Sequence, residues 1–173
     1  MTKISFDLVG FDLDGTLVDS SADLAAATNH ALASIGLPTH DVEEVKRFVG
    51  KGTRIMLERA LRASGDYSEA RLDALRPAFA DYYDRHLSVH TRPYSGAVDA
   101  LDALRERGVR VGLCTNKSER FTLPLLEELG LHDRFDAIVC GDTLGAGVLK
   151  PDPAPVAAMV ARAGGGRSVF LGD

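Results

Sequence analysis

Two carboxylates in the segment Asp12-Leu13-Asp14-Gly15-Thr16 directly follow a short apolar run, and this segment is the strongest chemical signal in the chain. Acidic residues and glycine are also common in polar turns, so the segment alone is open to a purely structural interpretation. Other polar groups follow or lie between later apolar runs: Thr115-Asn116-Lys117, Lys150 and Asp173. Parallel strands bind ligands beyond their carboxyl ends. We therefore predict one site built from all four segments.

The charges of this predicted site indicate what it binds. Two like unit charges about 4 Å apart repel by roughly 4 kcal/mol at an effective dielectric constant of about 20. Asp12, Asp14 and Asp173 are therefore not expected to share a pocket in ionised form without a cation. The candidate ligands carry oxygen, and the five histidines have no metal-binding spacing, so Mg²⁺ is the predicted cofactor. Lys150 and Thr115 then suit a phosphate-bearing substrate.

A carboxylate can attack phosphorus and form an aspartyl-phosphate, which divides one difficult displacement into two easier ones. We assign this nucleophilic role to Asp12, and we expect Asp14 to protonate the leaving alkoxide and then to deprotonate the attacking water. Thr115, Lys150 and the main-chain N–H groups after Asp12 are expected to stabilise charge on the phosphoryl oxygens. Further substrate contacts are predicted at Gly15, Thr16 and Asn116.

The elements that must hold these segments in place have an alternating pattern. Four short apolar runs are typical of strands buried on both faces, and they cover residues 6–11, 109–114, 135–140 and 168–171. Three helical patterns lie between them, at residues 95–108, 118–130 and 151–166. A parallel crossover usually contains a helix, so the alternation predicts an α/β fold with a Rossmann-like parallel sheet core wrapped by helices.

Residues 20–90 interrupt this alternation, because they carry helical patterns and no strand signal. Asp41 and Glu44 have the spacing of a capping box, and a long helical pattern runs from Ser68 to about His90. We therefore predict an all-α cap insertion. The predicted domains are a core formed by residues 1–18 plus 92–173 and a helical cap domain at residues 19–91, with residues 91–96 as the return linker.

Composition narrows the class of protein. The 173 residues are 45% hydrophobic and 26% charged, which is typical of a globular chain, and the net charge of -5 gives no reason to expect a nucleic-acid partner. The first apolar run contains acids, so we predict neither a signal peptide nor a membrane span. Cys114 and Cys140 fit a reducing compartment better than a disulfide framework. We expect a cytoplasmic protein, monomer or homodimer, that acts on a small phosphorylated metabolite.

Over its entire length, the chain resembles the haloacid dehalogenase superfamily of phosphotransferases. Asp12 and Asp14 stand where the first motif has its two acids, and Thr115, Lys150 and Asp173 match the second, third and fourth motifs. The resemblance implies that Asp12 is the nucleophile, that Asp14 is the acid/base, and that Mg²⁺ binds Asp12, the Asp14 main-chain carbonyl and Asp173. It also implies that the insertion is the small cap, and that the chain is closer to the phosphatases than to the dehalogenases.

Longer segments, such as residues 11–32 and 115–131, are similar to the bacterial phosphoglycolate phosphatases. This similarity implies 2-phosphoglycolate as the substrate. Related sugar-phosphate phosphatases, a pyrophosphatase and β-phosphoglucomutase share most of the same motifs and remain alternatives. Lys51 and Arg54 are candidates to bind a substrate carboxylate when the cap closes. A solvated helix start is an equally good interpretation of these two residues.

Two departures from the family pattern affect these expectations. The segment from Asp142 to Lys150 is longer than usual, which makes the reach of Lys150 less certain. Members of the family also continue beyond the Gly-Asp pair with which this chain ends. We therefore expect the natural protein to be longer and the last strand to be a sheet edge. On its own, this segment is expected to be weakly active or a non-catalytic phosphate-binding module.

Overall fold

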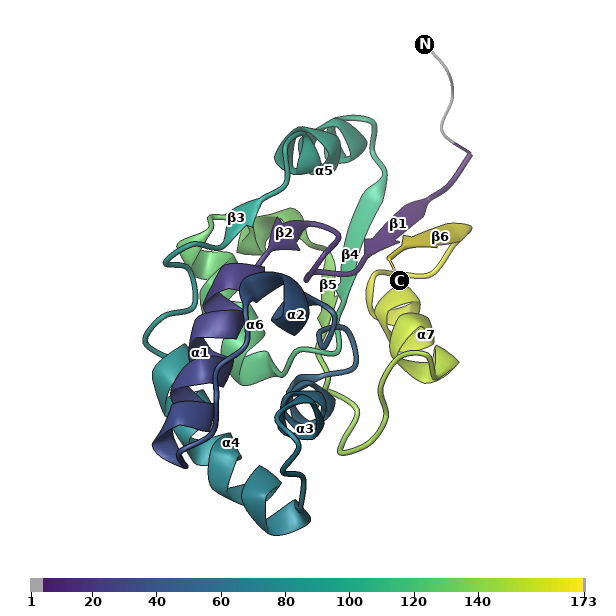
Figure 1. Ribbon diagram of the computed structural model, residues 1–173. Coiled ribbons are helices and arrows are strands. Elements are labelled where there is room, and N and C mark those ends of the chain that lie inside the picture. The colour runs from purple at the N-terminus through teal and green to yellow at the C-terminus, as the bar shows by residue number, and fades with distance from the viewer. Residues whose placement is uncertain (1–4, 173) are drawn as a thin grey trace. The chain divides into compact units, whose positions relative to one another are not determined.

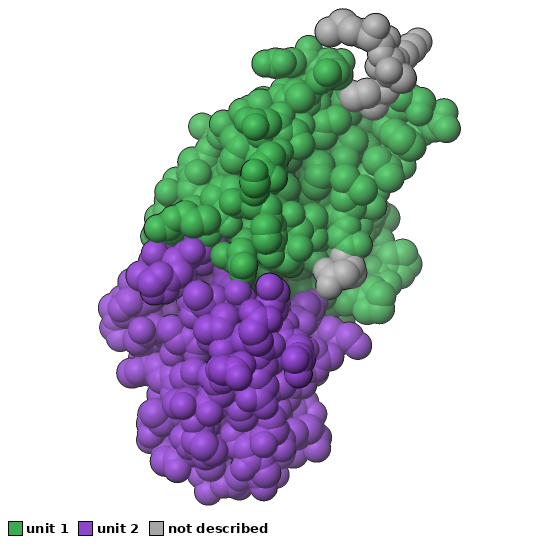
Figure 2. Space-filling model, turned by 45° about the horizontal axis from the view of Figure 1, so that its top comes forward, with its two compact units in different colours: residues 1–19, 92–173 green, residues 20–91 purple. Residues whose placement is uncertain are grey.

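The computed structural model describes residues 5–172, and the chain divides into two compact units (Figure 2). One unit combines the residues up to 19 with those from 92 onward, and the other consists of residues 20–91. The first contains the sheet, and the second contains only helices among its regular elements. Within the described residues, no helix combines the length and apolar character that a membrane span requires.

The main sheet has four strands, and every neighbouring pair in it is parallel. The strands are β1 (Leu8–Phe11), β4 (Arg110–Cys114), β5 (Ala137–Val139) and β6 (Ser168–Leu171). Their order is β5-β4-β1-β6, so β6 is an edge strand of the described sheet (Figure 1). All four residues of β1 are buried, as expected for a strand that is covered on both faces. The predicted α/β fold with a parallel sheet is confirmed.

The register of the sheet brings the strand ends together. Phe11 of β1 aligns with Leu113 of β4 on one side and with Leu171 of β6 on the other. The residues that follow these positions therefore lie together at the carboxyl ends of the strands. Asp12 is the first residue beyond β1, and Thr115 the first beyond β4, so the fold places two predicted site residues next to each other.

Three helices connect the strands of this unit: α5 (Ala97–Glu106), α6 (Glu119–Glu128) and α7 (Pro153–Arg162). A single 3-10 turn, η1 (His132–Arg134), follows α6. Helix α7 begins after Asp152, whose side chain accepts a hydrogen bond from the Ala154 N–H at 2.8 Å. The helices agree with the predicted ones, although each is a few residues shorter than its sequence pattern.

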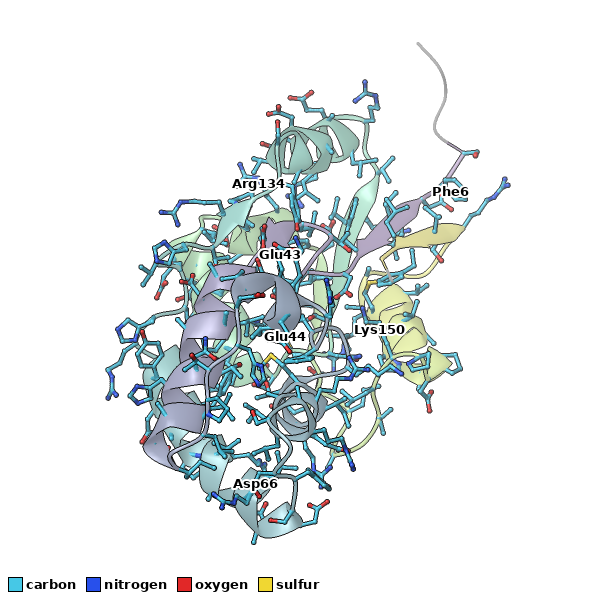
Figure 3. All side chains as sticks on the ribbon, viewed as in Figure 1. Phe6, Glu43, Glu44, Asp66, Arg134 and Lys150 are labelled. Carbon is cyan, nitrogen blue, oxygen red and sulfur yellow. The ribbon has the colours of Figure 1, made fainter. Side chains whose placement is uncertain are left out.

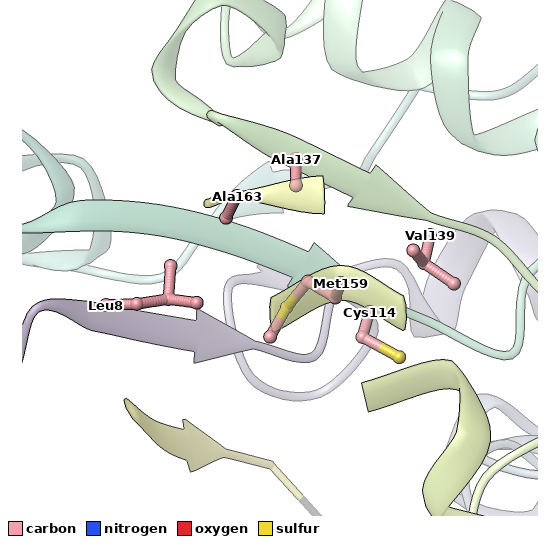
Figure 4. Packing of buried hydrophobic residues seen from close by; sticks show 6 residues of the cluster. All are labelled: Leu8, Cys114, Ala137, Val139, Met159 and Ala163. Atoms are coloured by element: carbon pink, nitrogen blue, oxygen red, sulfur yellow. The ribbon is translucent and has the colours of Figure 1, made fainter. Parts of the chain in front are cut away.

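Helix α7 packs directly on the sheet because two strand residues opposite it have no side chain. Met159 lies over Gly10 and Gly112, and a Cβ atom at Gly112 would be 2.5 Å from the Met159 sulfur. The surrounding cluster is apolar and comprises Leu8, Cys114, Ala137, Val139, Met159 and Ala163 (Figure 4). The two glycines in the strands thus permit a close approach between helix and sheet.

Two very short strands were not predicted. Strands β2 (Val18–Asp19) and β3 (Arg92–Pro93) pair in antiparallel orientation, so the predicted return linker at residues 91–96 contains a strand. Two residues are too few to show the alternation from which strands are predicted. Strand β2 comes just before the helical unit in the sequence and β3 just after it, so their pairing places these two segments side by side within the sheet unit.

The helical unit contains α1 (Ser21–Ser34), α2 (Val42–Lys46), α3 (Thr53–Ala63) and α4 (Glu69–Tyr83). The predicted cap at Asp41 is confirmed, because its carboxylate accepts the Glu44 N–H at 2.7 Å. The prediction that α4 reaches about His90 is wrong, since the helix ends at Tyr83. The N–H group of His90 donates instead to the Asp23 carboxylate of α1, which a continuing helix would not allow.

Candidate active site

Asp12 is held in place by the sheet that precedes it. Its N–H donates to the Leu171 carbonyl of β6 at 2.9 Å, which continues the ladder between β1 and β6. Its side chain is buried, and Oδ1 accepts the Leu13 N–H at 2.8 Å. Burial raises the pKa of Asp12, while the nearby Lys150 ammonium opposes this effect. A buried carboxylate of this kind is a stronger nucleophile than one in water.

Lys150 reaches Asp12 despite the long segment that precedes it. Its Nζ atom lies 2.7 Å from Asp12 Oδ2, and only 9% of its side chain is exposed. Lys150 comes from the segment just before α7 (Figure 3). The contact is an ion pair, and within residues 5–172 Nζ donates no hydrogen bond. A buried ammonium in this state retains donors for an anion.

Asn116 holds the main chain of Lys150. The Lys150 N–H donates to Asn116 Oδ1 at 2.8 Å, and Asn116 Nδ2 donates to the Lys150 carbonyl at 3.0 Å. The two bonds fix the position from which the Lys150 side chain starts. The sequence predicted a substrate contact for Asn116, whereas its amide is used here to support another residue of the site.

Asp14 forms an ion pair that the sequence analysis missed. Lys117 Nζ lies 3.0 Å from both oxygens of Asp14, and the two side chains are 4% and 13% exposed. The sequence places Lys117 just after a predicted strand but predicts no role for it. Its position two residues after Thr115, beside the predicted site, was the available signal. The described site therefore pairs two acids with two ammonium groups, so repulsion alone no longer requires a metal ion.

The other predicted residues of the sheet unit also lie close to these pairs. Thr115 is buried, and its Oγ1 accepts the Lys117 N–H at 3.2 Å. The N–H of Gly15 donates to the Val18 carbonyl at 2.9 Å, and that of Thr16 to the Leu13 carbonyl at 3.2 Å. These two N–H groups are thus used within the turn that carries Asp14, where Gly15 supplies a positive φ of 82°.

The buried Asp12 carboxylate at the end of β1 and the lysine that faces it can now be set beside what is known of similar proteins. Residues 9–173 match the model of the haloacid dehalogenase-like hydrolase family. The chain belongs to this family. Its relatives include proteins named phosphoglycolate phosphatase.

Two of these relatives come from bacteria. The phosphoglycolate phosphatase of Agrobacterium fabrum is 42% identical over 167 residues, which cover 94% of this chain and 70% of the relative. Phosphoglycolate phosphatase 1 of Pseudomonas aeruginosa is 41% identical over 170 residues, which cover 96% of this chain and 62% of the relative. The chain thus spans less than two thirds of the Pseudomonas protein.

A solved structure agrees with this relationship. The crystal structure of a predicted phosphoglycolate phosphatase from Haemophilus somnus superposes with a TM-score of 0.89 at 30% sequence identity. The match covers 100% of this chain and 78% of that one. The fold of this chain is therefore similar to that of the solved structure over its whole length.

The family implies a divalent cation, and the described residues fit it in part. Asp12 offers a carboxylate and Asp14 a main-chain carbonyl, both of which are oxygen donors of the type that Mg²⁺ prefers. Asp173, the third predicted ligand, lies outside the described residues. In the range 5–172, no group of three acidic, histidine or cysteine side chains could hold a metal ion. These donors suit Mg²⁺ rather than a softer metal.

Lys51 and Arg54 belong to the helical unit. Lys51 is exposed and precedes α3, while Arg54 lies in the first turn of that helix. The Arg54 guanidinium is 2.7 Å from Glu69 and 3.7 Å from Glu58, so it forms an ion-pair network within its own unit. The substrate role of these two residues stays a prediction.

Proposed function

We propose that this chain carries the Mg²⁺-dependent phosphomonoesterase activity of a haloacid dehalogenase-like phosphatase, with 2-phosphoglycolate as the substrate. The observation that carries the proposal is the pair formed by Asp12 and Lys150. A buried carboxylate that faces a buried ammonium with unused donors is suited to attack a phosphoryl group that the ammonium binds. The names of the relatives support the choice of substrate.

In the first step, an Asp12 carboxylate oxygen attacks phosphorus and forms an acyl-phosphate bond. The bond between phosphorus and the ester oxygen breaks, and its electron pair leaves with that oxygen. Asp14 donates a proton to the leaving alkoxide, which departs as an alcohol. Lys150 and the Thr115 hydroxyl stabilise the charge on the remaining phosphoryl oxygens.

In the second step, a water molecule attacks the phosphorus of the aspartyl-phosphate. Asp14, now a carboxylate, accepts a proton from this water, so each turnover restores its starting state. The bond between phosphorus and the Asp12 oxygen breaks, and inorganic phosphate and the free carboxylate result. Bound Mg²⁺, held by Asp12, the Asp14 carbonyl and Asp173, would supply positive charge to the phosphoryl oxygens.

The proposed partner is a small phosphorylated metabolite in the cytoplasm, with no nucleic acid and no membrane involved. The net charge of -5 gives no attraction to a polyanion. A monomer and a homodimer are both compatible with this proposal. The predicted cap role of the helical unit, with its boundaries at residues 19 and 91, is part of the same proposal.

Phosphate release from 2-phosphoglycolate, with and without Mg²⁺, tests this function. We expect any turnover, even if it is weak, to stop on chelation of the metal, and Asp12→Asn should reduce kcat by about 10³-fold or more. Asp99→Asn, an exposed carboxamide substitution in α5, is the matched control and should keep full activity.

Parallel assays with glucose phosphates and pyrophosphate separate the substrate from the mechanism. Release from a glucose phosphate with none from phosphoglycolate would contradict the substrate and leave the mechanism standing. Phosphate binding without release from any ester would overturn the proposed activity in favour of a binding module.

A further inference from the structure

The ion pair between Lys117 and Asp14 has a function in the site that the family motifs do not assign. We infer that Lys117 is the positioning residue of the acid/base Asp14, an inference that rests on the proposed function. One ammonium lies 3.0 Å from both carboxylate oxygens, so it restricts the rotation of the carboxylate about its own axis. Both side chains are largely shielded from water, which strengthens the contact.

Lys117 can act as a fixed support because its main chain is anchored on both sides. Its N–H donates to Thr115 Oγ1 at 3.2 Å, and its carbonyl accepts the Gly141 N–H at 2.8 Å. The first bond lies within the loop after β4, and the second ties this loop to the one after β5. The flexible stem of the lysine therefore starts from a hydrogen-bonded main chain, and its ammonium end is buried.

The turn that carries Asp14 holds its main chain in place. The N–H groups of Thr16, Leu17 and Val18 all donate to the Leu13 carbonyl, which closes the turn around Asp14. The side chain still has two rotatable bonds, and a proton donor must lie within hydrogen-bond reach of the leaving oxygen. The two acids of the site that lie within the described residues thus have separate lysine partners: Lys150 contacts Asp12, and Lys117 contacts Asp14.

The positioning role of Lys117 can be tested with two substrates, because their leaving groups differ in whether they must be protonated. The alkoxide of phosphoglycolate requires protonation, whereas the nitrophenolate of 4-nitrophenyl phosphate is stable as an anion. The ratio kcat/KM covers the steps up to departure of the leaving group, so the later water attack does not enter. Lys117→Met should lower kcat/KM for phosphoglycolate by about 10²-fold and for 4-nitrophenyl phosphate by less than about threefold.

A double-mutant cycle shows whether Lys117 acts through Asp14. In an Asp14→Asn background, Lys117→Met should cause no further loss with phosphoglycolate, because the group that it positions is already gone. This double variant also removes both charges together and so avoids an unpaired buried carboxylate. Lys117→Arg, which keeps two donors toward a carboxylate, should recover part of the activity. Lys46→Met, at an exposed lysine of α2, is the control and should be unchanged.

The outcomes separate this inference from the proposed function. An equal loss with both substrates, or an additive loss in the double variant, would overturn the positioning role. Absence of turnover by the wild-type chain with either substrate would overturn the proposed function instead. The inference is then decided by a crystal structure of Lys117→Met: a reoriented Asp14 carboxylate supports it, and an unchanged one overturns it.

Discussion

Burial controls the acidity of the sulfur groups beside the site. Cys114 is the last residue of β4, and burial raises the pKa of its thiol to about 11. Cys140 follows β5, and burial likewise raises the pKa of its thiol to about 11. Both residues are free cysteines. A thiol with this pKa remains protonated at neutral pH, and only the thiolate is nucleophilic.

Both thiols should therefore react slowly in the folded protein. A shift from the ordinary value of 9.0 to about 11 reduces the thiolate fraction at neutral pH by about 10²-fold. We expect alkylation by iodoacetamide to be slower by at least this factor in buffer than in concentrated urea. The native rate should rise as the pH increases toward 11, because deprotonation is what limits it. Mass spectrometry of quenched samples measures both rates, and equal rates with and without urea would contradict the assigned pKa values.

Helix α1 is tied to the end of its own unit by a single buried carboxylate. Asp23 accepts the N–H of His90 at 3.0 and 2.9 Å, the N–H of Thr91 at 2.7 Å and the Thr91 hydroxyl at 2.7 Å. Its exposed fraction is 1%, and its partners are 67 and 68 residues away in sequence. The first turn of α1 thus fixes the chain where it leaves the helical unit.

Asp23→Ala should destabilise the protein, because it leaves three buried or half-buried donors without an acceptor. Each lost partner costs about 1–3 kcal/mol, and we expect a total decrease of about 3 kcal/mol in the free energy of unfolding. Urea unfolding that is monitored by circular dichroism measures this free energy. Asp73→Ala, at a residue of α4 whose side chain is 71% exposed, should change the value by less than about 0.5 kcal/mol. A similarly small effect of Asp23→Ala would contradict a stabilising role for the hydrogen bonds that Asp23 accepts from His90 and Thr91.

The chain as a whole consists of a sheet unit and an inserted helical unit. The predicted functions of the two units differ: catalysis for the sheet unit and substrate selection for the helical unit. The sheet unit carries Asp12, Asp14, Thr115 and Lys150. The helical unit carries Lys51 and Arg54, which the sequence predicts to select the substrate. The ion pair between Arg54 and Glu69 is largely exposed, so its loss on substrate binding would cost little.

If the helical unit selects the substrate, its basic residues should affect only substrates with a second anionic group. Lys51→Ala and Arg54→Ala are each expected to raise KM for 2-phosphoglycolate by about tenfold, with kcat little changed. The KM for 4-nitrophenyl phosphate, which has no carboxylate, should stay the same. Arg76→Ala, an exposed charge of α4, controls for the general loss of a positive charge. An unchanged KM for phosphoglycolate in both variants would favour the interpretation of a solvated helix start.

Local patterns were sufficient for most elements of the fold. The apolar runs located the four strands of the main sheet, and Asp41 marked a helix start, because periodicity and capping depend on residues close in sequence. The end of α4 at Tyr83 and the pairing of β2 with β3 could not be predicted in this way. Both depend on partners that lie far along the chain, such as Asp23 for the His90 N–H.

The sequence by itself determined the family, the parallel sheet and the clustering of acids and lysines at the strand ends, because strand and helix periods and the first motif are local properties. Only the tertiary structure decided which lysine serves which acid. Lys117 contacts Asp14 across 103 residues, and Lys150 contacts Asp12. These pairings depend on the strand order β5-β4-β1-β6 and on the paths of the loops, which bring side chains from different strand ends within 3.0 Å of each other. The role of Lys117 could therefore be found only in the folded chain.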